Sequence, residues 1–507
     1  MFTIKATAVL LGSLLISLIA STQASAATDL LIKVQATKSS GVVHQLMQIA
    51  GESKDNVSVI TDPLSDGTQW VSLKTSVKAA SLSMRALSAM PGVVAVQPNY
   101  PIKLMHDYKL EDGPQKDALM KAIIAAHGES GLVGGLASPD NPEIPAATQL
   151  GSGADSLFSS QWGMKDNNVV SGWKGTKGDG FVVAVLDSGV DYTHEDLVDN
   201  MWRNPGETGT DAQGHDKATN GIDDDGNGYI DDVVGWDFVS NDNKPYDLAV
   251  DPIKLLFGGG NPGHGTHCAG NIAARGDNGK GIAGVAPRAK IMALRFLSEK
   301  GEGSTDAAVK AIAYSIKMGV KVSSNSWGSS GEDPADAVGN KALRDALEAS
   351  RLAGQLFVAA AGNGDKQGKG YDNDSAKDPG YPASYPDEHI LSVAAIDKTD
   401  GIGSFSNWGA NSVDIGAPGV AVFSTMVNNQ YNDKVIDMPN FGIVATWDGT
   451  SMATPHVAGA AALYWADHPK ATAQEVKKAI MSSAKPIPSL AGKVVTGGKL
   501  SVEQLMK

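Results

Sequence analysis

The sequence predicts a doubly wound α/β fold with a mostly parallel sheet, preceded by a small α+β unit. The main observation is a series of short, continuous apolar runs, as expected of parallel strands that are covered on both faces. Amphipathic helical stretches separate several of these runs. The length of 507 residues allows several domains, and 42% hydrophobic against 19% charged residues excludes a globally disordered chain.

Charge and cysteine content exclude further classes. The chain has 42 Lys and Arg against 56 Asp and Glu, a net charge of −14, which argues against a nucleic-acid binder with a basic face. Its single cysteine excludes internal disulfides and multi-cysteine metal sites. The acids concentrate between Asp187 and Asp251. Such a run forms either a solvated face or a cation site.

Residues 1–26 have the layout of a secretory signal peptide. Lys5 precedes an apolar run, and small residues follow it up to Ala26, where cleavage is expected. A retained membrane anchor is the weaker alternative, because the run is short for a bilayer. We therefore expect a secreted protein, extracellular or periplasmic, with no membrane association after signal removal.

Residues 27–104 read as a split βαβ unit of the ferredoxin-like type. Strand-like and helical stretches alternate in the order strand, helix, strand, strand, helix, strand: 30–34, 42–49, 57–60, 70–73, 81–90 and 92–97. Residues 105–154 are rich in Gly, Pro, Ser and Asn, with one helical island at 116–126. They are expected to be a linker or processing region.

Residues 155–507 are expected to form the α/β domain. Its apolar, strand-like runs are 181–186, 289–296, 320–324, 356–361 and 390–395, and helical stretches include 305–318 and 334–353. In such sheets, reactive residues gather at the carboxyl ends of the strands.

Three segments of this domain carry residues suited to nucleophilic catalysis. Asp187 ends an apolar strand, His264 lies in a Gly-rich turn that enters a helix, and Ser451 begins an Ala-rich helix with Pro455 expected in its first turn. A serine needs a base, and the base needs a carboxylate to fix its tautomer. Singly, these residues could be a cap, a structural histidine and an N-cap. Their joint context and their order along the chain argue against coincidence.

These segments resemble the subtilisin-like serine proteases (subtilases), with features similar to the thermitase and proteinase K branches, over residues 155–507. The resemblance implies that Asp187 orients His264, that His264 is the general base and acid, and that Ser451 is the nucleophile. Residues 358–364 resemble the family's oxyanion-hole strand, which implies that Asn363 donates its side-chain N–H to the oxyanion.

The same resemblance implies a substrate-binding cleft in which backbone hydrogen bonds hold an extended peptide and pockets select side chains. The residues implied are Gly301, Gly303, Ser326, Trp327, Gly328, Ala360, Ala361, Gly362 and Gly380. Gly380 falls at the base of the primary pocket. Its small size predicts a broad preference for large apolar residues at the cleavage position.

Residues 220–232 place oxygen-bearing side chains at alternate positions, as in the first half of a calcium loop of the EF-hand type. The candidate ligands are Asp223, Asp225, Asn227, Tyr229, Asp231 and Asp232. The acid that usually ends such a loop is missing, so Asp231 or Asp232 would have to complete the coordination shell of the ion. A plain acidic turn without an ion is the alternative. The family resemblance alone implies a second structural Ca²⁺ site at Asp155, Asp196, Gly276, Asn278, Lys280 and Ile282.

The resemblance extends to residues 27–104, which look like an inhibitory propeptide that aids folding and is removed by the enzyme itself. An independent binding domain is the alternative. Cys268, one helical turn after His264, is expected to be a buried apolar filler. Its proximity to His264 predicts inactivation by bulky thiol reagents.

We thus expect a monomeric, secreted serine endopeptidase that works through an acyl-enzyme on Ser451. Its partners would be protein or peptide substrates and its own propeptide. The main alternative is a non-catalytic secreted protein on the same fold that binds calcium or a partner. An enzyme restricted to one dedicated partner is a third. The sequence does not fix where within residues 105–154 the mature N-terminus lies.

Overall fold

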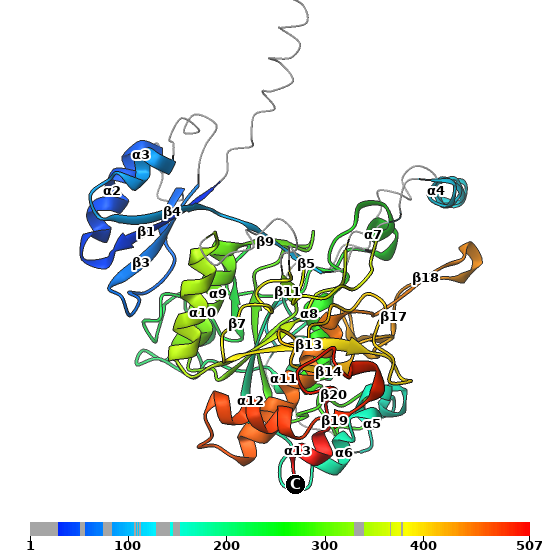
Figure 1. Cartoon of the computed structure of the whole chain (residues 1–507). Coiled ribbons are helices and arrows are strands. Elements are labelled where there is room, and N and C mark those ends of the chain that lie inside the picture. The colour runs from blue at the N-terminus through cyan, green and yellow to red at the C-terminus, as the bar shows by residue number, and fades with distance from the viewer. Residues whose placement is uncertain are drawn as a thin grey trace, which may run out of the picture. The chain divides into compact units, whose positions relative to one another are not determined.

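A computed structural model gives the fold of the chain (Figure 1). It describes residues 29–50, 56–74, 84–105, 108, 110, 113–127, 142–145, 153–328, 339–365, 367–376 and 379–507. The predicted signal peptide and about half of the predicted linker lie outside these residues. The chain forms two compact units, residues 1–99 and 100–507.

The first unit is a four-stranded antiparallel sheet with two helices. The sheet order is β2-β3-β1-β4, which is the order of a split βαβ fold. Its elements are β1 (Leu30–Gln35), α2 (Ser39–Ala50), β2 (Val57–Val59), β3 (Thr68–Leu73), α3 (Met84–Ser88) and β4 (Val93–Pro98). Apolar side chains of the strands and both helices form its own core.

The second unit is built on a nine-stranded sheet with the order β19-β20-β14-β13-β12-β10-β6-β8-β7. All neighbouring strands are parallel except β19 and β20. The strands are β6 (Val182–Asp187), β7 (Gly235–Asp237), β8 (Lys290–Arg295), β10 (Val322–Asn325), β12 (Leu356–Ala360), β13 (Ile390–Ile396), β14 (Ile415–Pro418), β19 (Lys485–Pro486) and β20 (Gly498–Lys499). The predicted doubly wound α/β fold is confirmed.

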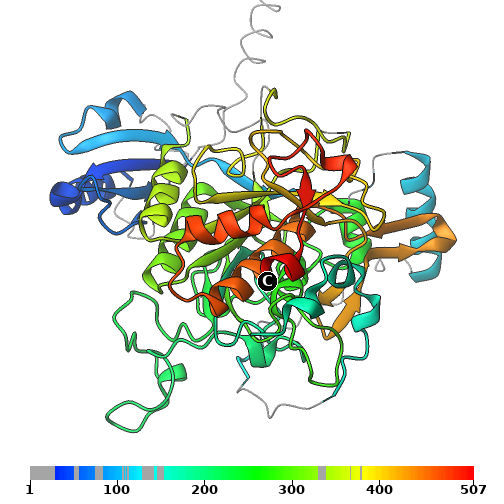
Figure 2. The same ribbon diagram turned by 60° about the horizontal axis from the view of Figure 1, so that its bottom comes forward.

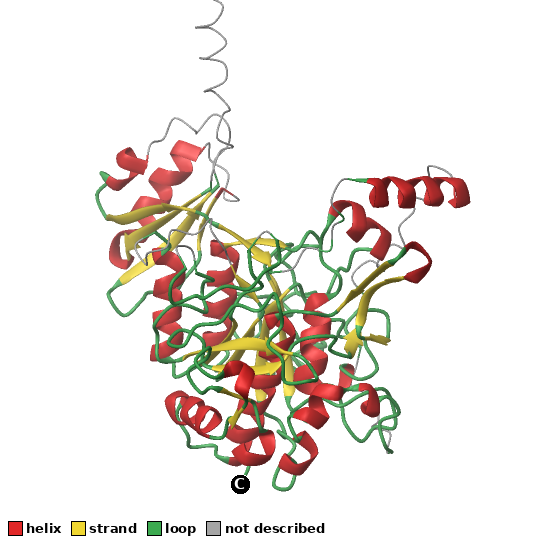
Figure 3. Ribbon diagram, turned by 45° about the vertical axis from the view of Figure 1, so that its right-hand side comes forward, coloured by secondary structure: helices red, strands yellow, loops and turns green. Residues whose placement is uncertain are grey.

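Helices flank the strands of this sheet on both sides (Figure 3). Helices α8 (His264–Ala273) and α11 (Thr450–Asp467) pack together and contact the central strands, and α9 (Thr305–Lys317) packs against α10 (Lys341–Leu352). Among the residues described, this unit also has the α-helices α4 (Pro114–His127), α5 (Trp162–Asp166), α6 (Val169–Gly172), α7 (Pro252–Gly258), α12 (Ala473–Ser482) and α13 (Val502–Leu505). Within the described residues, no helix is both long and apolar enough to cross a membrane.

Two small antiparallel elements beside the main sheet matter for function. One is a three-stranded sheet with the order β11-β5-β9, formed by β5 (Pro101–Leu104), β9 (Glu302–Ser304) and β11 (Trp327–Gly328). The other is the hairpin of β17 (Lys434–Met438) and β18 (Ile443–Thr446), which lies beside α4 in Figure 2. The sequence pattern predicted neither β5 nor this hairpin.

Candidate active site

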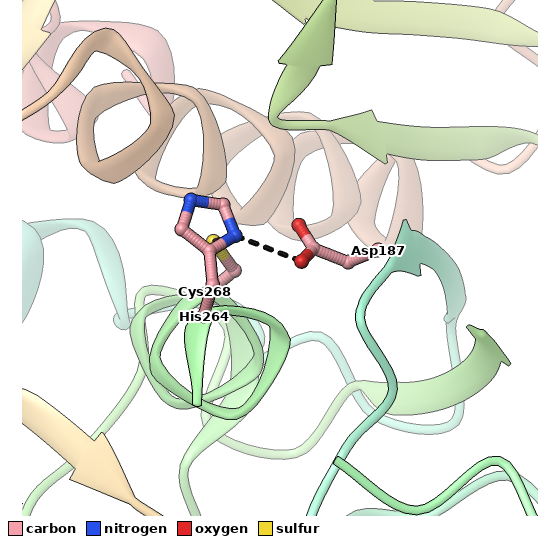
Figure 4. Close-up of side chains that lie close together, drawn as sticks. All are labelled: Asp187, His264 and Cys268. Atoms are coloured by element: carbon pink, nitrogen blue, oxygen red, sulfur yellow. Dashed lines mark hydrogen bonds and ion pairs between the residues drawn. The ribbon is translucent and has the colours of Figure 1, made fainter. Parts of the chain in front are cut away.

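The parallel sheet and helix α8 bring a carboxylate and an imidazole together. Asp187 is the last residue of β6, and His264 is the first residue of α8. Asp187 Oδ1 accepts a hydrogen bond from His264 Nδ1 at 2.8 Å (Figure 4). It also accepts one from the Ser188 backbone N–H at 2.7 Å. A Cβ on Gly265 would lie 2.1 Å from the Gly189 carbonyl oxygen, so only glycine lets α8 approach the end of β6 this closely.

Burial and charge compete at this pair. Burial of the imidazole opposes protonation, but the negative charge of Asp187 and its hydrogen bond hold the pKa of His264 well above its usual value. The bond to Asp187 also fixes the neutral tautomer with the proton on Nδ1, so Nε2 is left as the proton acceptor. His264 thus has the arrangement of a general base oriented by a carboxylate.

A second buried carboxylate, Asp247, organises the residues around this pair. Its Oδ1 accepts from Ser188 Oγ at 2.9 Å and from Asn261 Nδ2 at 2.7 Å, and its Oδ2 accepts from the backbone and hydroxyl of Thr266. Burial raises the pKa of Asp247 to about 6. Asn261 Oδ1 in turn accepts from the backbone N–H of His264 at 2.9 Å. The network fixes the start of α8, and no motif in the sequence pointed to Asp247.

Ser451 lies in the first turn of α11 and is 3% exposed. Its hydroxyl donates to the Ser326 carbonyl at 3.1 Å. The prediction that Pro455 occupies the first turn is wrong, because α11 begins at Thr450 and Pro455 lies inside the helix. Proline has no N–H to donate to the carbonyl four residues earlier, which belongs to Ser451.

The carbonyl freed by Pro455 finds other donors. Ser326 Oγ donates to it at 2.9 Å, and the Cys268 thiol donates to it at 3.5 Å. Burial raises the pKa of Cys268, which keeps the thiol protonated as a donor. The sulfur lies 3.9 Å from His264 Nδ1. Cys268 is therefore buried, as expected, but it also helps to hold the backbone of Ser451.

Asn363 follows β12 and has a fixed amide orientation. Its Oδ1 accepts from the backbone N–H of Thr450 at 2.8 Å and from the Thr450 hydroxyl at 2.8 Å. Because a backbone N–H can only donate, the amide oxygen must face Thr450, and Nδ2 faces the other way. That Nδ2 donates to the Met105 carbonyl at 3.4 Å. The sequence did not indicate that Thr450 orients the side-chain amide of Asn363.

The chain's own residues 101–105 occupy the space between the two predicted substrate-binding strands. β5 is the central strand of its sheet: Leu104 pairs with Trp327 and Lys103 with Gly328 on one side. On the other side, Ile102 pairs with Gly303, and the Leu104 N–H donates to the Gly301 carbonyl at 2.9 Å.

Met105 follows this strand, next to the predicted pocket walls. A Cβ on Gly328 would lie 2.3 Å from Met105 Cε, so the thioether end of Met105 occupies the space over this glycine. Gly380 lies against Ala361, with 3.0 Å from an added Cβ to the Ala361 carbonyl oxygen. Ala360 ends β12, and the Gly362 N–H donates to Thr450 Oγ1 at 3.2 Å.

The acidic loop gathers a different set of carboxylates from the alternate-position pattern. The ligand oxygens of Glu207, Asp225 and Asp232 lie within 4.8 Å of one another. Glu207 was not predicted, because it lies 18 residues before Asp225 in a segment without a motif. Burial raises the pKa of Glu207, and it raises the pKa of Asp232 to about 6. Glu207 Oε2 is buried and has no hydrogen-bond partner among the described residues.

The other predicted loop ligands face their own backbone or neighbouring side chains. Asp223 accepts from the N–H groups of Asn227 and Gly228, and Asp231 accepts from the Gly221 N–H. Asn227 Nδ2 donates to Asp232 at 2.8 Å, and the Tyr229 ring packs against Trp236.

The second predicted calcium loop is assembled around Asp196. Its two carboxylate oxygens accept from Asn278 Nδ2 at 2.7 Å and from the Ile282 N–H at 2.8 Å. Asp155 accepts from the Asn278 N–H at 3.2 Å. The loop also contains Gly276 and Lys280. The backbone N–H of Lys280 donates to Asn278 Oδ1 at 2.9 Å. These carboxylates already have donors, unlike Glu207 Oε2.

Comparison with known proteins agrees with this geometry. The family model described as the subtilase family matches residues 178–501. The chain is 34% identical over 310 residues to thermitase of Thermoactinomyces vulgaris, covering 61% of this chain and 84% of thermitase. It is 34% identical to a thermophilic serine proteinase of Bacillus sp. strain AK1 (60% and 57% covered) and 36% identical to subtilisin DY of Bacillus licheniformis (44% and 70% covered).

Proposed function

The chain belongs to the subtilase family and is a serine endopeptidase, and from this premise we propose that it hydrolyses peptide bonds through an acyl-enzyme on Ser451 and first cuts its own chain after Met105. One observation carries the proposal. Residues 101–105 lie as a strand between two strands of the cleft, with the Met105 carbonyl on the amide of Asn363.

In the proposed reaction, Ser451 turns its hydroxyl from the Ser326 carbonyl toward His264 and gives its proton to Nε2. Its oxygen attacks the Met105 carbonyl carbon, and the oxyanion accepts a hydrogen bond from Asn363 Nδ2. His264 then returns the proton to the nitrogen of His106, which leaves as an amine. Water hydrolyses the acyl-enzyme in the second half of the reaction, with His264 again as the base. Asp187 stabilises the imidazolium in both halves.

The self-cleavage site also supports the proposed substrate preference. Met105 is a large apolar side chain seated over Gly328, and Ile102, three residues earlier, is only 2% exposed. A side chain buried in the cleft gains hydrophobic stabilisation that an exposed one does not. Substrates with large apolar residues at the cleaved position, and at the position three residues before it, are therefore the expected class.

The proposal assigns residues 27–105 to an inhibitory propeptide. The first unit has the split βαβ fold and its own core, so it can act as a folded body once the bond after Met105 is cut. Residues 1–26 are proposed to be a signal peptide that directs secretion; they lie outside the described residues. No nucleic acid partner is proposed, since the net charge is −14.

We also propose a structural calcium ion at Glu207, Asp225 and Asp232. Hard Ca²⁺ prefers six to eight oxygen ligands. Three carboxylates share this site, and one buried oxygen of Glu207 has no partner within the described part of the chain, so the donor set fits such a cation. The loop at Asp196 offers a second, weaker candidate, because hydrogen bonds within the loop already satisfy both oxygens of its carboxylate.

Expression of the full chain with and without Ser451→Ala tests the catalytic proposal. Intact mass should show two fragments, residues up to Met105 and residues from His106, in the wild type only. Ser171→Ala, an exposed serine on α6, is the matched control and should process like the wild type. An uncut wild-type chain would contradict the proposed self-cleavage after Met105, and cutting in Ser451→Ala would show that another protease acts.

A further inference from the structure

The chain has an apolar surface on the leaving-group side of the active site, formed by α7, β17 and β18. Side chains of α7, the hairpin and Trp447 form one buried cluster with residues that follow Met105 in the chain. The backbone N–H of Leu110 donates to the Leu256 carbonyl on α7 at 2.8 Å. The surface therefore already holds a segment of this chain.

Tyr108 fills the part of this surface nearest the catalytic residues. It is the third residue after the proposed cleaved bond and is 8% exposed. Its ring meets Trp447 edge to face, with centroids 6.4 Å apart. The centroid of the Trp447 ring also lies 6.4 Å from that of the His264 imidazole. A substrate residue at the same position would need the space that Tyr108 occupies.

Helix α4 anchors the segment further from the active site. Leu119 on α4 is 1% exposed and belongs to the same cluster as Leu255 and Ile436. In Figures 1 and 2 the helix lies beside α7 and the β17–β18 hairpin. A helix of 14 residues is marginally stable alone in water, so contacts such as that of Leu119 are what hold it.

We propose that Tyr108, Leu110 and helix α4 together form a second inhibitor, which stays bound on the leaving-group side after the bond between Met105 and His106 is cut. This inference rests on the proposed self-cleavage. The contacts of Tyr108, Leu110 and Leu119 all lie beyond that bond, so cutting it removes none of them. The segment also stays covalently joined to the catalytic unit, and release of the first unit leaves it in place.

The proposal predicts a specific selectivity. A substrate with only a chromogenic anilide after the cleaved bond does not reach the surface, whereas a peptide with five residues after that bond must displace Tyr108. Leu119→Asp should release the segment, since burying a leucine side chain corresponds to about 10- to 100-fold in an equilibrium constant. Ala118→Asp, at an exposed position of the same helix, is the matched control.

The first test measures kcat/KM of the self-processed proteins on both substrates. Leu119→Asp should raise the value for the long peptide about tenfold or more and leave the anilide value unchanged. Ala118→Asp should change neither. If the large fragment begins at His106 but Leu119→Asp behaves like the wild type, the second inhibitor is refuted and the proposed self-cleavage stands. If the large fragment begins after Leu119, the segment is no longer joined to the catalytic unit, and the second inhibitor is refuted in that case too.

The second test does not depend on catalysis. In full-length Ser451→Ala, amide hydrogen exchange of residues 114–127 should be slow, and Leu119→Asp should make it fast while Ala118→Asp does not. Exchange of these amides at the rate of a free peptide in Ser451→Ala would overturn the proposal, even if the wild type is never cut.

Discussion

Removal of calcium from the proposed site at Glu207 should destabilise the protein in a pH-dependent way. In the ion-free protein, burial raises the pKa of Asp232 to about 6, against 3.8 for the free side chain. An acid whose folded pKa is raised is destabilising when it ionises, so the ion-free protein loses stability as pH rises from about 4 to about 6. A bound cation removes this cost by neutralising the carboxylate.

The magnitude follows from the pKa of Asp232 alone. Keeping this carboxylate ionised above pH 6 costs about 2–3 kcal/mol in the ion-free protein. The catalytic unit has some 400 residues, and unfolding entropy scales with chain length, so this corresponds to about 3 °C in melting temperature. Burial also raises the pKa of Glu207, so its ionisation adds to the loss.

The assay is thermal unfolding of full-length Ser451→Ala, with calcium and with excess chelator, at pH 7.5 and pH 4.5. The chelator should lower the melting temperature at pH 7.5 and have little effect at pH 4.5. Glu207→Gln should weaken this calcium dependence, whereas Glu503→Gln, at the far C-terminus, should keep it. An equal chelator effect at both pH values, or none at either, would be inconsistent with a calcium ion bound by these carboxylates.

Four further predictions concern the proposed catalytic site and acid stability. Asn363→Ala should lower kcat by about 10²–10³ with little change in KM, as measured on a chromogenic peptide, because it removes the proposed oxyanion donor. A bulky maleimide that labels Cys268 should abolish activity, and Cys268→Ala should resist it; full activity of a fully labelled protein would contradict this. The raised pKa of His264 predicts that kcat/KM increases with pH into the alkaline range, so a profile that is flat above pH 6 would be inconsistent. Burial lowers the pKa of His267 to about 3 and of His456 to about 4, so stability should fall by about 1.4 kcal/mol per histidine for each pH unit below about 6.5, as denaturant unfolding would show.

The sequence was most informative where local pattern and local chemistry coincide. Asp187 directly follows an apolar run, so both its strand and its place at the carboxyl end of that strand could be predicted. The helical island at 116–126 corresponds to α4, and the run at 181–186 differs from β6 by one residue. Each of these depends on the residues within one element.

Contacts between distant segments could not be predicted in this way. Glu207 joins the acidic loop only through the fold, and Asp247 reaches Thr266 from a loop without a motif. Strand β5 is four residues long, and its two partner strands lie about 200 residues further along the chain. A short segment of mixed polarity carries no signal for such pairing, because its hydrogen bonds are made by the backbone.

The same backbone pairing bears on the order of events in the proposed processing. Main-chain hydrogen bonds accept almost any extended peptide, so the cleft itself does not favour its own chain over a foreign substrate. A covalently attached strand such as β5 instead gains from its high effective concentration, which would make the proposed self-cleavage the first reaction. The proposed cut breaks only the bond between Met105 and His106. The contacts of Tyr108 and Leu119 lie beyond that bond, in the part of the chain that stays joined to the catalytic unit, so activity toward long substrates would depend on a separate release step.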